Sequence, residues 1–127
     1  MQRTIFVVDD SDTNLSVAKE TLKENYRVMT LPSAAKMFAL IEKVRPDLIL
    51  LDVEMPEMNG FEALSRLKES PAYSDIPVIF LTGMLDEEIK ARGAQLGVAG
   101  FISKPFQEPV LLNLIETRLD KETIRNR

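Results

Sequence analysis

The chain has 127 residues, of which 45% are hydrophobic and 28% are charged, with 20 acidic against 16 basic residues. This composition supports one hydrophobic core and excludes intrinsic disorder, so we expect a single domain. The absence of cysteine and histidine excludes disulfides, thiolate metal sites and imidazole chemistry, and the acidic balance argues against a general nucleic-acid surface.

Short apolar runs alternate with amphipathic segments along the chain. Three of these runs are almost continuously apolar, as expected for parallel strands that are covered on both faces. The second run alternates apolar and polar residues, which favours an exposed edge strand. The predicted strands are residues 4–8, 26–30, 48–51, 77–81 and 98–102.

Helices are predicted between these strands. Asn59 followed by Glu62 is typical of a helix N-terminus. The segment 86–96 is the weakest predicted helix, because only Ile89 and Leu96 mark an apolar face and Gly93 costs about 1 kcal/mol relative to alanine. Apolar residues recur at helical spacing in two further segments, at Met37, Leu40, Ile41 and Val44 and at Leu111, Leu114, Ile115 and Leu119.

Five strands alternating with five helices indicate an α/β fold with a doubly wound parallel sheet. We assign residues 1–120 to one domain and residues 121–127 to a polar C-terminal tail. Either the last helix extends through this tail as the remnant of a linker, or the helix simply ends. The first apolar run is too short for a signal peptide, and no stretch approaches the roughly 20 apolar residues that span a bilayer. We therefore expect a cytoplasmic protein without a membrane partner.

Polar residues follow four of the predicted strands where each strand ends. They are Asp9 and Asp10, Asp52, Thr82 and, just beyond the last strand, Lys104. In an open α/β sheet ligands bind outside the carboxyl ends of the strands, so these side chains are expected to meet at one rim. Taken singly, each also fits an ordinary turn, helix-start, strand or surface position. Their joint occurrence at successive strand ends favours a functional site.

Three carboxylates at one rim repel one another unless one is protonated or a cation is bound. Oxygen ligands without histidine or cysteine select a hard ion, and Mg²⁺ fits best. A cation beside a carboxylate, a hydroxyl and an ammonium group suits phosphoryl transfer. The expected nucleophile is then a carboxylate, which forms an aspartyl phosphate.

With these residues the chain resembles a receiver domain of a two-component response regulator. The resemblance covers roughly residues 3–119 and depends on four segments in order: VVDD, LLDVEMPEMNG, FLTG and GFISKPF. It implies a flavodoxin-like receiver fold with strand order 2-1-3-4-5 over residues 1–120. It also implies a phosphorelay switch that receives a phosphoryl group from a sensor histidine kinase or phosphotransfer protein and controls an unidentified effector or output domain.

The resemblance assigns a role to each matching residue. Asp52 is the expected phosphoacceptor, assisted by Thr82 and Lys104, and Phe101 is the expected aromatic switch residue that turns inward after phosphorylation. The Lys104–Pro105 bond is expected to be cis, since X–Pro bonds adopt this form cheaply. Gly60 matches the helix start after the phosphoacceptor. The expected Mg²⁺ ligands are Asp9, Asp10, Asp52 and the backbone carbonyl of Glu54.

Some residues depart from the commonest receiver pattern. Gly83 stands where alanine is more usual, and Phe101 replaces the frequent tyrosine and equally fits an ordinary core position. Glu54 and Met84 lie two residues beyond Asp52 and Thr82, at positions that tune phosphoryl lifetime in the family. A glutamate there either hinders attacking water or adds to metal binding.

Two other functions share part of this residue pattern or this fold. A small Mg²⁺-dependent phosphoester hydrolase of the haloacid-dehalogenase type usually carries Asp-x-Asp-x-Thr after its first strand, whereas this chain has Asp9-Asp10-Ser11-Asp12. A docking module would keep the fold without turning over phosphate. We expect instead a switch that is not a multiple-turnover enzyme, does not bind nucleic acid directly, and is able to form a homodimer through its fourth helix, fifth strand and fifth helix.

Overall fold

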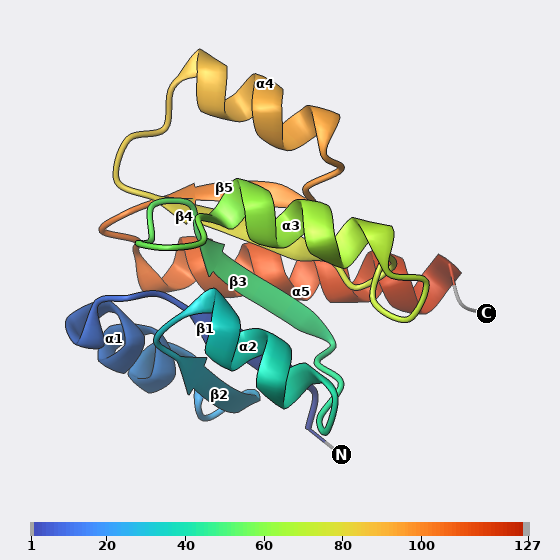
Figure 1. Cartoon of the computed structure of the whole chain (residues 1–127). Coiled ribbons are helices and arrows are strands. Elements are labelled where there is room, and N and C mark those ends of the chain that lie inside the picture. Colours follow the sequence, from blue (N-terminus) through green and yellow to red (C-terminus); the bar gives the residue numbers. More distant parts are fainter. Residues whose placement is uncertain (1, 126–127) are drawn as a thin grey trace.

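A parallel β-sheet forms the centre of the molecule (Figure 1). The computed structural model describes the backbone of residues 2–125 and the side chains of residues 2–120. Within this part, the strands lie side by side in the order β2-β1-β3-β4-β5, which confirms the predicted doubly wound arrangement. The strands are β1 (Thr4–Val8), β2 (Arg27–Leu31), β3 (Leu48–Asp52), β4 (Val78–Thr82) and β5 (Gly100–Ser103).

Burial explains which strands occupy the centre. Every residue of β1, β3 and β4 is buried, as their continuous apolar runs predict. The alternating strand β2 lies at one edge and is buried fully only at Leu31. All neighbouring strands run parallel, so their carboxyl ends meet at one rim of the sheet.

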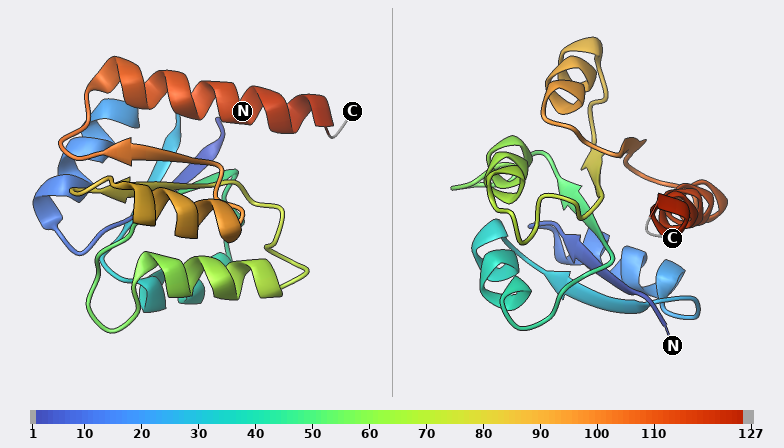
Figure 2. Two further views of the ribbon diagram at one scale, coloured as in Figure 1. Left: turned by 90° about the horizontal axis from the view of Figure 1, so that it is seen from above. Right: turned by 90° about the vertical axis from the view of Figure 1, so that its right-hand side faces the viewer.

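Helices cover both faces of the sheet. In the end-on view of Figure 2, α2 and α3 lie on one side of the sheet and α1 and α5 on the other. The partly buried Ile89 and Leu96 of the α4 region pack into the same hydrophobic cluster as α2 and α3. The helices are α1 (Asp12–Leu22), α2 (Ala34–Ile41), α3 (Gly60–Glu69), α4 (Glu87–Gln95) and α5 (Glu108–Arg125).

Polar side chains begin four of these helices. The predicted cap at Asn59 is confirmed, since its side chain accepts a hydrogen bond of 2.9 Å from the backbone N–H of Glu62. Ser11, Ser33 and Asp86 cap α1, α2 and α4 in the same way. The caps at Ser11, Asn59 and Asp86 begin the helices that follow β1, β3 and β4, at whose ends predicted site residues lie.

The last strand begins two residues later than predicted. Val98 donates its backbone N–H to the carbonyl oxygen of Gly93 at 3.0 Å, and Gly97 has a φ of +81°. This left-handed residue ends α4, as glycine commonly does, and Val98 still belongs to the helix exit. Ala99 donates its backbone N–H to the carbonyl of Val78 at 2.7 Å and leads into β5, which starts at Gly100.

The last helix extends beyond the predicted domain end at residue 120. It runs to Arg125, so the backbone of residues 121–125 continues α5. Side chains of the predicted tail 121–127 lie outside the described residues, and the division into domain and tail stays a prediction. Within the described part of the chain, none of the helices combines the length and apolar character that crossing a bilayer requires.

Candidate functional site

Asp9 follows β1 and is completely buried, whereas its neighbour Asp10 is exposed. The carboxylate of Asp9 accepts a hydrogen bond from the backbone N–H of Ser11 on Oδ1 at 2.9 Å. Its other oxygen, Oδ2, accepts from the side-chain amide of Asn14 at 3.3 Å. The start of α1 therefore holds one acidic side chain in a defined orientation.

Asp52 is the last residue of β3 and is only 1% exposed. The chain leaves the strand through a tight connection in which the N–H of Gly60 bonds to the carbonyl of Val53 at 2.9 Å. A Cβ atom on Gly60 would lie 2.6 Å from the carbonyl oxygen of Asp52. Only glycine allows α3 to start this close to the buried carboxylate.

Lys104 joins two of the carboxylates. Its Nζ lies 3.2 Å from Oδ2 of Asp9 and 3.2 Å from Oδ1 of Asp52. The Lys104 backbone N–H bonds to the carbonyl of Thr82 at 2.8 Å, and the Lys104–Pro105 peptide bond is cis. One ammonium group thus bridges the ends of β1 and β3 from the end of β5.

The pKa of Asp52 reflects this crowding. Burial and the neighbouring Asp9 carboxylate raise the pKa of Asp52 from 3.8 to about 6, while Lys104 and the N–H of Glu54 act in the opposite direction. For Lys104, burial alone would lower the pKa, but the attraction of Asp52 and Asp9 outweighs burial and raises it. Near neutral pH the site therefore holds an ionised but destabilised Asp52 beside a charged lysine.

The acidic cluster has the composition of a hard-cation site. One carboxylate oxygen each from Asp9, Asp10 and Asp52 lies within 4.8 Å of the others. Oxygen donors of this kind fit Mg²⁺, which is usually held by one or two carboxylates together with waters and phosphate oxygens. A bound cation would also relieve the repulsion that raises the pKa of Asp52.

Thr82 ends β4 and is fully buried. Its hydroxyl lies 3.3 Å from the carbonyl oxygen of Met84, and it accepts from the Met84 N–H at 3.1 Å. The Thr82 hydroxyl oxygen also lies 3.4 Å from Oε1 of Glu54, which belongs to the loop after β3. The hydroxyl is thus held between two loops at the rim.

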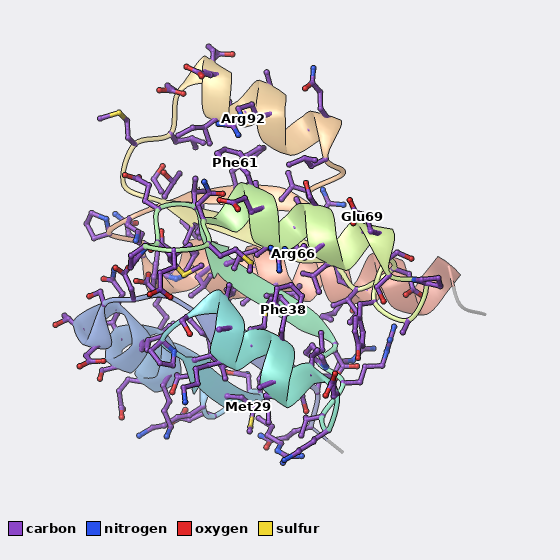
Figure 3. The ribbon with its side chains drawn as sticks, in the orientation of Figure 1. Met29, Phe38, Phe61, Arg66, Glu69 and Arg92 are labelled. Carbon is purple, nitrogen blue, oxygen red and sulfur yellow. The ribbon has the colours of Figure 1, made fainter. Side chains whose placement is uncertain are left out.

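Phe101 lies on β5 and is half-buried. Its ring centroid is 6.1 Å from that of Phe80, which makes an edge contact with Phe61 at 5.3 Å. A Cβ atom on Gly93 would lie 2.7 Å from Cζ of Phe101, so the ring occupies the space that glycine leaves on α4. Figure 3 shows Phe61 between α3 and α4, beneath Arg92, whose guanidinium carbon is 3.9 Å from the centre of the Phe61 ring.

Comparison with known proteins decides the family. A family model described as the response regulator receiver domain matches residues 5–116. The chain belongs to the response regulator receiver family. Among solved structures, this receiver is similar to the chemotaxis protein CheY4 of Vibrio cholerae, with a TM-score of 0.88, 30% sequence identity, and coverage of 92% of this chain and 98% of that one.

Curated relatives of this receiver differ in length. The protein PilH of Pseudomonas aeruginosa is 34% identical over 91% of this chain and 96% of its own. A Vibrio cholerae protein named "Probable cyclic di-GMP phosphodiesterase" is 36% identical over 95% of this chain but only 27% of its own. The receiver spans about a quarter of the length of the first curated relatives it matches.

The structure brings the predicted site residues of this receiver together at one rim. Asp9, Asp52 and Lys104 are in direct contact, Asp10 joins the acidic cluster, and Thr82 lies at the neighbouring strand end. The Glu54 side chain is exposed and reaches Thr82, whereas the expected metal contact of its backbone carbonyl stays a prediction.

Sequence reasoning missed two residues at this receiver site. Asn14 donates a hydrogen bond to Asp9. The sequence signal for this contact is a polar residue in the first helical turn after the aspartate pair. Gly93 seats Phe101, but in the sequence it stood out only as a weak point of a helix.

Proposed function

We propose that this receiver domain is a phosphorylation-dependent switch in which Asp52 accepts a phosphoryl group from a phosphohistidine of a sensor histidine kinase or phosphotransfer protein. The observation that carries the proposal is the bridge of Lys104 between Asp9 and Asp52, each at 3.2 Å. It supplies a positive charge beside a buried carboxylate, which is where phosphoryl transfer to Asp52 needs it.

Hydrogen bonding distinguishes Asp52 from the other two aspartates. Lys104 and the N–H of Glu54 both bond to Oδ1 of Asp52. Among the described residues, none bonds to Oδ2 of Asp52, so this oxygen is the available nucleophile. Both oxygens of Asp9 are engaged, and Asp10 is exposed.

The transfer is a substitution at phosphorus. Oδ2 of Asp52 forms the new P–O bond while the P–N bond to the donor imidazole breaks. The electron pair of the broken bond stays on that nitrogen, and the imidazole leaves neutral because its other nitrogen carries the proton. Asp9, Asp10, Asp52 and the Glu54 carbonyl would hold Mg²⁺, which when bound supplies positive charge to the phosphoryl oxygens.

Lys104 and Thr82 respond to the new charge on Asp52. Lys104 exchanges its contacts with the carboxylates for the phosphoryl oxygens, with which it forms a stronger charge pair. The Thr82 hydroxyl leaves Glu54 and Met84 and donates to another phosphoryl oxygen. Its departure changes the space beside Phe101, and the surface of α4, β5 and α5 shifts toward a second arrangement.

This switch controls a partner or output domain and is not itself a multiple-turnover enzyme. The face formed by α4, β5 and α5 is the proposed output surface and the proposed site of homodimerisation. The acidic net charge of −4 disfavours direct binding to nucleic acid. We place the protein in the cytoplasm, where a kinase partner would reach it.

Incubation with Mg²⁺ and a small acyl phosphate tests the proposal. We expect a labile phosphoprotein in the wild type and in Asp75→Asn, an exposed aspartate in the loop before β4, but not in Asp52→Asn. Absence of labelling from small donors and from histidine kinases would leave a docking module. Continued turnover of ordinary phosphate esters would indicate a hydrolase.

A further inference from the structure

The buried Asp9 carboxylate has two side-chain donors that meet at a single oxygen. Nζ of Lys104 and Nδ2 of Asn14 lie 3.2 Å and 3.3 Å from Oδ2 of Asp9. The backbone N–H of Ser11 occupies Oδ1 at 2.9 Å. Asp9 is completely buried, so these three donors replace the water that a carboxylate otherwise binds.

The two side-chain donors are held in different ways. Asn14 lies in the first turn of α1, and its own N–H bonds to the capping hydroxyl of Ser11 at 3.3 Å. Its short side chain therefore stays beside Asp9. Lys104 has a long side chain that already divides its charge between Asp9 and Asp52, and it is the group that responds to a phosphoryl group in the proposed function.

We propose that Asn14 is a positioning residue for phosphoryl acceptance, because it keeps Asp9 hydrogen-bonded when Lys104 turns to the phosphoryl group on Asp52. This inference rests on the proposed function. It explains why the neutral Asn14 amide bonds to Oδ2 of Asp9, an oxygen that Lys104 already contacts. The amide adds no charge to compete with Lys104 or with a cation held by Asp9, Asp10 and Asp52.

The energetic reason lies in the number of donors left on Asp9. With Asn14 present, departure of Lys104 leaves the carboxylate two hydrogen-bond donors beside any bound cation, the Asn14 amide and the Ser11 N–H. Without Asn14 it leaves one. A buried charge that loses hydrogen bonds is strongly destabilised, so Asp9 then retains Lys104 and opposes phosphorylation of Asp52.

Initial rates of Mg²⁺-dependent labelling by a small acyl phosphate provide the first test. We expect Asn14→Ala to lower the rate roughly fivefold, the loss of one hydrogen bond to a charged group after partial replacement by water. Asn14→Gln, which keeps the amide, should recover part of the rate. Thr13→Ala is the matched control, an exposed neighbour on the same turn, and should label like the wild type.

A mutant cycle between Asn14 and Lys104 provides the second test, in the unphosphorylated protein. In a Lys104→Ala background, Asn14→Ala should lower the folding equilibrium constant at least about threefold more than in the wild type, since Asp9 then keeps a single donor. A purely structural role of Asn14 would give the same loss in both backgrounds.

The outcomes separate the inference from the proposed function. A wild type that accepts no phosphoryl group overturns the proposed function and the inference with it. A labelled wild type with an equal rate in Asn14→Ala, or with additive losses in the mutant cycle, overturns the inference alone.

Discussion

The helices α3 and α4 follow two site residues, yet they are attached to the protein very differently. α3 follows the Asp52 loop and buries Gly60, Phe61, Ala63, Leu64 and Leu67. α4 follows the Thr82 loop, and of its residues, all of which the structure describes, Gly93 alone is buried. A hollow of about 240 Å³ separates the two helices, lined by Phe61, Glu62, Ser65, Arg92, Gln95 and Leu96.

The two parts of the proposed switch therefore differ in how firmly the structure around them is packed. The proposed phosphoacceptor Asp52 is fixed next to the firmly packed α3, through the close approach at Gly60. Thr82, whose hydroxyl is proposed to respond, lies at the start of the loop that connects β4 to the sparsely packed α4. Segments with few buried contacts open at low free energy, so movement is expected on the Thr82 side while the acceptor keeps its geometry.

The largest expected effect compares the same truncation at both helices. Leu67→Ala in α3 removes a side chain that is 1% exposed, and we expect it to lower the free energy of unfolding by about 3 kcal/mol. Leu96→Ala removes the half-buried leucine at the end of α4, and about 1 kcal/mol is expected there. Urea denaturation measures both values, and equal losses would contradict the contrast between the helices.

The buried charge beside α3 makes stability depend on pH. The pKa of Asp52 is about 6 in the folded protein against 3.8 ordinarily, so the folded state binds more protons between these values and wild-type stability falls as pH rises through them. Asp52→Asn lacks this loss. Its advantage over the wild type should grow by up to about 3 kcal/mol from about pH 4 to about pH 7.

Denaturant titrations in the presence of a chelator measure this advantage. Addition of Mg²⁺ near neutral pH should raise the melting temperature of the wild type more than that of Asp52→Asn, because the cation relieves the repulsion among the three carboxylates. If the stability difference between Asp52→Asn and the wild type stayed constant with pH, the pKa of Asp52 would not be raised in the folded protein.

Gly93 offers a way to disturb α4 without touching the rim. Alanine at this position would place Cβ 2.7 Å from the Phe101 ring, and we expect a net loss of about 1 kcal/mol, overpacking minus the better helix propensity. In a Phe101→Ala background the loss should become smaller or turn into a gain of less than about 1 kcal/mol, since the better helix propensity is then opposed only by the approach of Cβ to Cε2 of Phe80 at 3.2 Å. A loss of equal size in both backgrounds would exclude the ring as its cause.

The smallest effect concerns the contact between the two helices. Arg92→Ala removes a guanidinium group 3.9 Å from the Phe61 ring, and we expect a loss of about 0.5 kcal/mol together with faster amide exchange in α4. Arg66→Ala, at an exposed arginine of α3, is the matched control and should change neither quantity measurably. Unchanged exchange in Arg92→Ala would show that this contact does not hold α4.

Much of the fold followed from local patterns. The apolar runs of β1, β3 and β4 identified the central strands, because a strand covered on both faces is apolar along most of its length. The start of β5 was placed too early, since the left-handed turn at Gly97 depends on how α4 ends and not on the apolar character of residues 98 and 99. The helical continuation past residue 120 was one of several open outcomes.

By itself, the sequence determined which groups stand at the strand ends, because parallel strands bring those ends to one rim whatever the details of packing. Tertiary structure decided what these groups do to one another. It placed Lys104 between Asp9 and Asp52, and it raised the pKa of Asp52 by burial. Distances and desolvation arise only when segments far apart in the chain pack together, so the net charge of −4 says nothing of them.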